Sequence, residues 1–334
     1  MVELNDRQTR VLFAVIRAGL WPDTEDDGLT EAALSLDSRE WKELFRAARE
    51  QAVTGLFTDG LKRMKERPAC CDFAYLNGVM LTARMEKRNR LLAEAAQMLK
   101  DRYPGSWIFK GPQLTRFYPE PLHRETGDID LVVPGLDEEV DYAFVFQGET
   151  VNVELHPWPE YLTSPLRNKN LQHIIRGDYP ERRGELSVEV NLLCLILHVR
   201  RHVLSDGFGL KQLCDIAVIL QNVPYDPERL RSFFRQTGGE RFVACLMKLL
   251  EEGFGVRHTC LVEKKPGKKA YALLRKALLE EGYDNKQAWR ESSGWMESAW
   301  LRWKRCLHLY PLMGSEALWM PFYQAIQRRK RNRC

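Results

Sequence analysis

The sequence predicts an α+β protein in which a small mixed β-sheet is enclosed by N-terminal and C-terminal helical regions. Apolar residues recur at helical spacing before residue 103 and again after residue 184. Between these regions lie four short β-branched or aromatic runs, separated by glycine and proline. With 334 residues, of which 44% are hydrophobic, the chain can bury a real core. We therefore divide it into an N-terminal helical region (1–102), a sheet-containing core (103–184) and a C-terminal helical region (185–334).

The N-terminal region is expected to contain three helices. Asn5 is placed to cap the first, which carries an apolar stripe from Val11 to Ile16. Ser38 is expected to open a second amphipathic helix, with apolar residues between Trp41 and Ala48. A third helix is expected from Phe73 to Leu99, because this stretch is rich in Leu, Met, Ala, Glu and Arg.

Four strands are expected in the central region. They are Trp107–Phe109, Ile129–Val133, Tyr142–Phe146 and Val151–Leu155, each short and rich in β-branched or aromatic residues. The segment Gln147–Thr150 has the composition of a tight hairpin connection. The third and fourth strands should therefore pair with each other.

Helical periodicity returns in the C-terminal region. Helices are expected at Leu186–Val203 and Leu210–Leu220, on either side of a Ser205–Gly207 turn. Further along, four apolar residues fall at i, i+4, i+7 and i+11, with basic residues alongside; they are Met296, Trp300, Trp303 and Leu307, next to Arg302, Lys304 and Arg305. We favour a helical core for this stripe, with a weak membrane-surface or partner contact as the alternative.

Two basic segments are expected at the surface of the C-terminal region. Lys264–Lys269 has the composition of an exposed loop, and Arg328–Arg333 that of a frayed tail. Such a tail could touch anionic lipid, RNA or polysaccharide, but a run of charges is usually just solvated.

Charge and cysteine usage exclude several protein classes. The 50 basic and 46 acidic residues leave a formal charge of +4, too balanced for bulk nucleic-acid binding. The eight cysteines form neither a CxxC pair nor a zinc-type cluster, which favours a reducing cytoplasm over a disulfide framework. The N-terminus has no signal-peptide pattern, and the most apolar segment, Val188–Val199, is too short and polar to cross a membrane. We therefore expect a cytoplasmic protein with no membrane-spanning segment.

Two aspartates at the start of the second expected strand are the first candidates for chemistry. In the run Gly127–Val133, alternation puts Asp128 and Asp130 on one face of the strand and the apolar residues on the other. Neighbouring carboxylates repel each other unless a cation sits between them. Mg²⁺ is commonly held by one or two carboxylates together with substrate phosphates.

The fourth expected strand repeats this pattern with Glu154. Its polar face carries Asn152, Glu154 and His156, so pairing beside the second strand would bring Glu154 to Asp128 and Asp130. Three carboxylates around two Mg²⁺ or Mn²⁺ ions can activate a hydroxyl and neutralise a leaving pyrophosphate, with Glu154 as general base. The alternative for the aspartates is a solvated strand end or a cap on a neighbouring helix.

An ordered set of motifs resembles a known family. The set is Lys110-Gly111, Tyr118-Pro119, Arg124, Gly127–Val133, Glu154-Leu155-His156, the histidines His198 and His202, Lys211 and Asp215-Ile216-Ala217. It is similar to a bacterial family of uncharacterised nucleotidyltransferases within the DNA polymerase β superfamily, over roughly residues 40 to 222. The resemblance implies a polymerase β-like core that uses an NTP as substrate. It also implies that the core transfers a nucleoside monophosphate to an acceptor hydroxyl on a small molecule, protein or glycan.

The chain departs from the family pattern in three places. Glu154 stands where the family usually has Asp, so this ligand is longer by one methylene. Only 23 residues separate Asp130 from Glu154, where the family usually has more structure, including a helix. Lys110-Gly111 stands where the wider superfamily has a Gly-Ser helix start. Gly111 allows a close backbone approach, and Lys110 is either a phosphate ligand or a surface lysine before a turn.

The remaining motif residues have more than one interpretation. Arg124 either neutralises phosphate or pairs with Asp128. His198 and His202 are four residues apart and either line the nucleotide or acceptor pocket with Lys211 or form a structural polar seam. A metal pair lacks an evident third ligand. His156 begins a His-Pro-Trp-Pro segment that we expect to close the cleft.

Two other functions compete with catalysis. The short core and Glu154 are compatible with a catalytically impaired nucleotide-binding or scaffold protein that keeps the fold. An RNA-directed transferase is disfavoured by the near-neutral charge and by the lack of an aromatic-basic strand motif.

Overall fold

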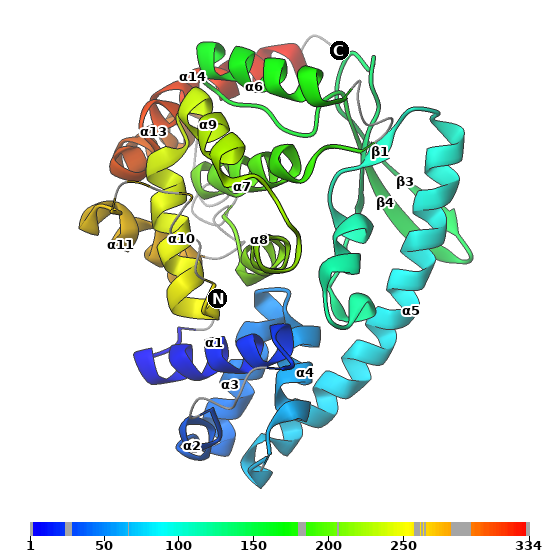
Figure 1. The fold of residues 1–334 in the computed structure, drawn as a ribbon, viewed down its shortest axis with the longest axis vertical. Coiled ribbons are helices and arrows are strands. Elements are labelled where there is room, and N and C mark those ends of the chain that lie inside the picture. Colours follow the sequence, from blue (N-terminus) through cyan, green and yellow to red (C-terminus); the bar gives the residue numbers. More distant parts are fainter. Residues whose placement is uncertain are drawn as a thin grey trace.

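The computed structural model describes residues 3–23, 29–65, 67–179, 185–205, 207–256, 261, 263, 265–281 and 295–331. Its N-terminal part is helical and its central part contains a sheet (Figure 1). The N-terminal elements are α1 (Asp6–Leu20), α2 (Leu29–Leu34), α3 (Ser38–Glu50), α4 (Thr54–Arg63), the 3₁₀ turn η1 (Ala69–Cys71) and α5 (Asp72–Arg102). The central elements are β1 (Trp107–Ile108), η2 (Gly111–Phe117), η3 (Pro121–His123), β2 (Ile129–Val132), β3 (Val140–Phe146) and β4 (Glu149–His156).

The C-terminal part is again helical. Its elements are α6 (Pro165–Asp178), α7 (Val188–Leu204), α8 (Leu210–Asn222), α9 (Pro227–Thr237), α10 (Glu240–Phe254), α11 (Lys268–Lys276), the π-helical turn η6 (Ala277–Glu281), α13 (Trp295–Met313) and α14 (Ser315–Arg331). The predicted α+β class, a small mixed sheet between helical regions, is confirmed. None of the helices in the described residues has both the length and the apolarity needed to cross a bilayer.

The sheet has the strand order β1-β2-β4-β3. β2 and β4 are parallel, and the other two pairs are antiparallel. The turn between β3 and β4 consists of Gln147 and Gly148, with φ of 49° and 82°, as a two-residue type I′ hairpin turn requires. All four predicted strands and the predicted hairpin are confirmed.

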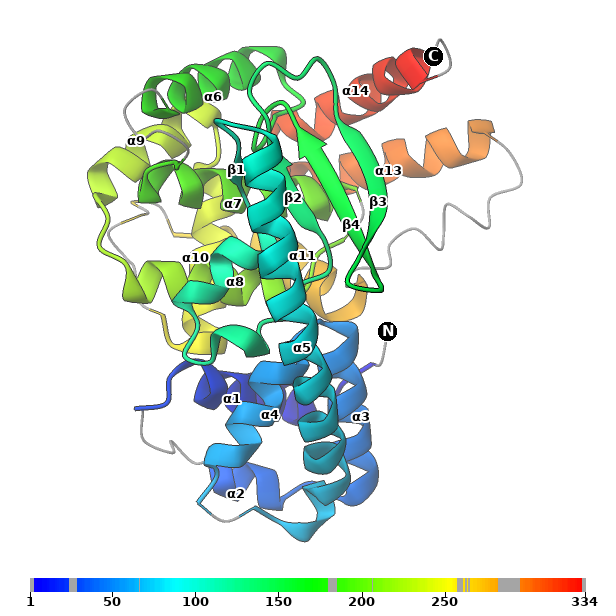
Figure 2. The same ribbon diagram turned by 90° about the vertical axis from the view of Figure 1, so that its right-hand side faces the viewer.

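Helix α5 covers one face of the sheet. Its C-terminal half packs against the strands in a separate apolar cluster, formed by Leu91, Leu92, Ala95, Ala96, Leu99, Ile129, Leu131, Val151, Val153 and Leu155. Figure 2 shows α5 running from the N-terminal helices along the sheet. The apolar face of β2 and β4 is therefore closed, and their polar residues point to the opposite side.

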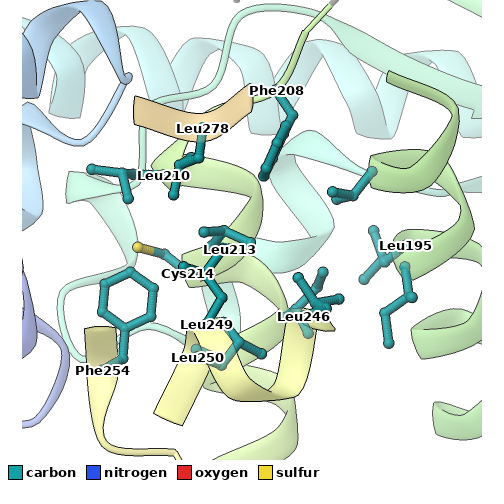
Figure 3. Close-up of a cluster of buried hydrophobic side chains, with 14 of the residues drawn as sticks. Leu195, Phe208, Leu210, Leu213, Cys214, Leu246, Leu249, Leu250, Phe254 and Leu278 are labelled. Atoms are coloured by element: carbon teal, nitrogen blue, oxygen red, sulfur yellow. The ribbon is translucent and has the colours of Figure 1, made fainter. Parts of the chain in front are cut away.

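A second, larger apolar cluster joins the N-terminal helices to the C-terminal ones. Figure 3 shows part of it, in which leucines of α8 and α10 pack together with Phe254. The indole N–H of Trp21, at the end of α1, donates to the carbonyl of Phe254, at the end of α10, over 2.8 Å. This cluster contains residues from both sides of the boundaries at 102 and 184. The division of the chain into three regions stays a prediction.

Helix caps account for several element boundaries. Asn5 caps α1 and forms a reciprocal pair of hydrogen bonds with Gln8, as predicted for its capping role. The second predicted helix begins at Ser38, but the capping side chain is that of Asp37, which accepts from two backbone N–H groups. Helix α4 is held close to α1 by glycine, since a Cβ at Gly60 would lie 1.9 Å from the carbonyl oxygen of Val15.

One prediction for the C-terminal region is wrong. The stripe of α13 does not form core, because Trp300, Trp303 and Leu307 are exposed. Burial in α13 and α14 falls instead on other apolar residues: Cys306, Leu309, Leu312, Met313, Ala317 and Met320. The fourth member of the stripe, the side chain of Met296, lies outside the described residues, as do Lys264, Asp206 and the end of the basic tail.

Candidate active site

The parallel pairing of β2 and β4 brings the predicted carboxylates together. Asp130 lies directly opposite Glu154 in the register. Because side chains alternate along a strand, both point away from the cluster that Ile129 and Leu131 form with α5. The prediction that the strand of Glu154 pairs beside that of Asp130 is confirmed.

These carboxylates open into a cavity of about 530 Å³. All ten predicted site residues line it: Lys110, Gly111, Arg124, Asp128, Asp130, Glu154, His156, His198, His202 and Lys211. They come from both sides of the fold, since the first seven belong to the sheet and its loops and the last three to α7 and α8. Their assignment to catalysis, metal or nucleotide stays a prediction.

Asp130 is the most tightly held group of the cavity. Its Oδ1 lies 2.8 Å from Nζ of Lys110 and 3.3 Å from Nε2 of His156, and its side chain is 3% exposed. Burial alone would raise the pKa of Asp130, but the two cationic neighbours outweigh it and hold this pKa well below its usual range. Lys110 is thus a partner of the carboxylate site, not the surface lysine that the alternative interpretation describes.

His156 bridges several carboxylates. Its Nε2 lies 3.3 Å from Glu154 as well as from Asp130, and its Nδ1 lies 3.4 Å from Glu139. Burial opposes protonation, but hydrogen bonds to these three carboxylates raise the pKa of His156 to about 11. The positive charge of the His156 imidazolium therefore offsets the negative charges of Asp130, Glu139 and Glu154.

The donor set fits a divalent cation. One ligand atom each from Asp130, Glu154 and His156 lie within 4.8 Å of one another, the one such group among the described residues. His156 can be a ligand only as the neutral imidazole, so metal binding at this atom would release its proton. Asp128 is not part of this group. Burial and the neighbouring Asp130 raise the pKa of Asp128, which is the strain that a bound cation would relieve. Carboxylate oxygens suit Mg²⁺ or Mn²⁺, and Lys110 would have to give up its contact with Asp130 on metal binding.

A chain of hydrogen bonds leads from Lys110 into the protein. Lys110 Nζ lies 3.3 Å from His198 Nε2, and His198 Nδ1 lies 2.9 Å from Glu160 Oε2. Burial, together with the charge of Lys110, lowers the pKa of His198 well below its usual value, so the ring is neutral. Nδ1–H then donates to Glu160, while Nε2 accepts from Lys110. Nε of Arg201 completes the chain, 2.8 Å from Glu160 Oε1.

Glu160 and Arg201 were missed by sequence reasoning. Glu160 follows a Pro-Trp-Pro loop, and its side chain is fully buried. A glutamate in a loop is normally expected at the surface, so nothing in the sequence indicated this burial. Arg201 stands three residues after His198, so the spacing on α7 was a usable signal. The rings of His198 and His202 lie 4.3 Å apart. Whether they line the nucleotide or acceptor pocket or form a structural seam stays a prediction. Neither histidine joins a group of three metal-type ligands in the described part of the chain.

Arg124 forms a buried ion pair that the sequence did not indicate. Its Nε and Nη2 donate to Asp215 over 2.6 and 2.8 Å, and both side chains are buried. The hydroxyl of Tyr118 donates to the same carboxylate over 2.6 Å. This pairing follows from the packing of α8 against η2, which brings Asp215 to the Arg124 loop at the wall of the cavity. Arg124 thus acts first as an internal ion-pair partner.

Gly111 and Lys211 complete the wall. Gly111 has φ of 64°, and a Cβ there would lie 2.9 Å from the carbonyl oxygen of Asp128, so only glycine allows this approach to the Asp128 backbone. Burial, together with the nearby Arg124, lowers the pKa of Lys211. A lysine that is costly to keep charged is a natural site for an anion.

A comparison with protein families relates part of the chain to a known family. Residues 135–255 match the model of the uncharacterised nucleotidyltransferase family. The resemblance inferred from the motifs is confirmed, and the matched residues include Glu154, His156, His198, His202 and Lys211. The match begins after Asp128 and Asp130, so these two rest on the strand motif and on the geometry above. No curated protein and no solved structure matches the chain.

Proposed function

We propose that this chain transfers a nucleoside monophosphate from an NTP to an acceptor hydroxyl, in a reaction that depends on Mg²⁺ or Mn²⁺. The observation that supports it most strongly is the in-register facing of Asp130 and Glu154 across β2 and β4. This pair faces a cavity that also holds Asp128 and two lysines, Lys110 and Lys211. Carboxylates for a cation next to ammonium groups for a polyphosphate are what such a transfer needs.

The exposed fractions of the carboxylates suggest which role each one has. Asp128, Asp130 and Glu154 would hold the cation, which supplies Lewis-acid stabilisation of the charge on the phosphates. Asp130 is 3% exposed, whereas Glu154 is 39% exposed, so an entering acceptor reaches Glu154. Glu154 is therefore proposed as the general base.

In the proposed step, the acceptor oxygen forms a bond to the α-phosphorus, and its proton passes to Glu154. The bond between the α-phosphorus and the bridging oxygen breaks, and pyrophosphate leaves with that electron pair. Lys110 and Lys211 are proposed to orient the phosphates, with His156, His198 and His202 lining the nucleotide or acceptor side of the cavity. The proposed acceptor hydroxyl belongs to a small molecule, a protein or a glycan.

The test is nucleotide transfer with variants of Glu154. Label from α-³²P NTPs should pass from the wild-type protein to an acceptor in whole-cell extract, with Mg²⁺ or Mn²⁺. Glu154→Gln keeps the shape but removes the base, and we expect a loss of at least about 10²-fold in turnover. Glu154→Asp restores the residue usual in the family and should keep much of the activity. No labelling with any of the four NTPs, by wild type or by Glu154→Asp, would refute the proposal.

One contact favours a second candidate, a nucleotide-binding or scaffold protein without catalysis. The Lys110 ammonium is already paired with Asp130, at the position where a cation is needed. Calorimetry separates the two functions. NTP binding that requires Mg²⁺ supports the transferase, and equal NTP binding with and without Mg²⁺ supports the scaffold.

We also propose a weak contact of the α13–α14 hairpin with an anionic membrane surface, for a protein that we place in the cytoplasm. The hairpin exposes large apolar side chains on both helices: Trp300, Trp303, Leu307, Tyr310, Leu318, Trp319, Phe322 and Ile326. Trp and Tyr beside lysine and arginine are typical of helices that lie at a membrane interface. Trp300→Ser with Trp319→Ser should reduce sedimentation with phosphatidylserine vesicles. Equal sedimentation of the variant and the wild type would contradict this contact.

A further inference from the structure

A second large cavity lies among the C-terminal helices. It measures about 650 Å³ and shares no lining residue with the candidate active site. Its walls are the first turns of α10 and α11, the end of α13, and single arginines of α6 and α9. α9, α10, α11 and α13 lie on the opposite side of the molecule from α5 (Figure 1). Its volume is that of a site for a small molecule.

The cavity concentrates positive charge in a chain that is nearly balanced. Six basic residues line it, against the two acidic residues Glu240 and Glu263; the six are Arg167, Arg231, Arg241, Lys265, Lys268 and Lys269. Arg231 is paired with Glu263 over 3.2 Å. The three lysines have no ion pair or side-chain hydrogen bond with any other described residue, and all three are exposed. The positive charges of these three lysines are therefore not neutralised by carboxylates of the described residues.

The charges in the first turn of α11 have the opposite sign to those that stabilise a helix N-terminus. Lys268 and Lys269 occupy its first turn, which contains no acidic residue, and the N-cap Gly267 offers no side-chain acceptor. The N-terminus of a helix carries partial positive charge, so two cations there repel it and each other. An anion in the cavity would accept hydrogen bonds from these backbone N–H groups and from the lysines together.

Arg167 adds an unsatisfied donor. Its Nη1 is buried and has no hydrogen-bond partner. Its guanidinium lies over Gly238, where a Cβ would come within 2.2 Å of Cζ, so this glycine makes room for the arginine. A buried guanidinium nitrogen without a partner is costly, so the rest of the Arg167 guanidinium, which lines the cavity, is the part available to an anion.

We propose that this cavity binds a soluble, phosphorylated small molecule that also has an apolar part. The phosphate groups would be held by Lys268, Lys269, Arg167 and the start of α11. The apolar part would rest on Ala244 and Leu261, which also line the cavity. Guanidinium and ammonium groups with helix N–H donors recognise phosphate as a class. This inference is independent of the proposed transferase activity.

Calorimetry with inorganic pyrophosphate tests the phosphate half of the site. The full-length chain is titrated in buffer with EDTA, so that binding cannot depend on a divalent cation. We expect saturable binding by the wild type. Lys268→Gln with Lys269→Gln should weaken it by about tenfold or more, because two charge-assisted hydrogen bonds are lost. The replaced side chains are exposed, so the fold is kept.

The matched control is Lys42→Gln with Lys62→Gln. It removes the same charge from exposed positions on α3 and α4 and should leave pyrophosphate binding unchanged. No binding by the wild type, or equal weakening by both double variants, would overturn the site. A separate arm uses vesicles of phosphatidylcholine with phosphatidic acid. Binding to vesicles alone, lost in the Lys268/Lys269 variant, would overturn the assignment to a soluble ligand.

Discussion

Removing the carboxylate of Asp215 should destabilise the protein strongly, because it leaves a buried guanidinium without its counter-charge. Asp215 accepts two hydrogen bonds from Arg124 and one from Tyr118, at 2.6 to 2.8 Å. The side chains of Arg124 and Asp215 are only 4% and 6% exposed, so little water is available to replace the lost partner. Breaking a buried ion pair from one side costs about 3–5 kcal/mol.

The lower end of this range applies here. Arg124 keeps contacts from Nη1 to the carbonyl of Glu125 and to Oγ1 of Thr126, at 3.3 and 3.2 Å. We therefore expect Asp215→Ala to lower the free energy of unfolding by about 3 kcal/mol. Urea unfolding followed by circular dichroism gives this difference from the midpoint and slope.

Two further variants make the reasoning refutable. Glu280→Gln breaks the exposed i, i+4 pair with Lys276 and should cost no more than about 0.5 kcal/mol. Arg124→Met combined with Asp215→Leu removes both charges and should be more stable than Asp215→Ala alone, since apolar replacement of a buried pair is often close to neutral. If Asp215→Ala costs as little as Glu280→Gln, the buried pair does not carry the energy assigned to it.

Three other outcomes are expected. Hydrogen bonds to Asp59 and Glu86 raise the pKa of His123 above 6.5. These bonds therefore stabilise the fold fully below the pKa of His123 in the unfolded chain, and the stabilisation is lost as pH rises through its pKa in the folded protein. His123→Gln should therefore cost more at pH 6 than at pH 9 in urea unfolding, and an equal cost would contradict the linkage. Gly60→Ala should lose about 2 kcal/mol, because the new methyl meets the Val15 carbonyl, whereas Gly177→Ala, with open space around it, should be neutral or stabilising in thermal melts. Asp130→Ala should abolish any dependence of NTP binding on Mg²⁺ in calorimetry, and a retained dependence would remove Asp130 from the metal set.

The sheet and the gathering of the site residues could be predicted from sequence because they depend on local patterns. Alternation fixes which face Asp130 and Glu154 share, and the Gln147–Gly148 turn fixes the neighbouring hairpin. Strand pairing then follows with few alternatives. Motif order added Lys110 and Lys211, whose positions in space no periodicity indicates.

The partners of the charged residues could not be predicted in the same way. Arg124 and Asp215 are 91 residues apart, and Glu160 and Arg201 are 41 apart, so their pairing depends on how helices pack. The α13 stripe shows the same limit. The sequence shows that the helix of Trp300 has an apolar face. Whether another part of the chain buries that face depends on the tertiary arrangement, which the periodicity does not indicate.

The contact between Trp21 and Phe254 has a consequence for how the chain folds during its synthesis. The two residues are 233 positions apart, yet they join the ends of α1 and α10 in one apolar cluster. At typical ribosomal speeds, roughly 10 to 50 seconds pass between the emergence of the first helix and that of its partner. During that interval the apolar surface of α1 that α10 covers in the finished fold has no native partner. Nascent chains stalled before residue 254 should therefore engage chaperones more strongly than chains stalled after it.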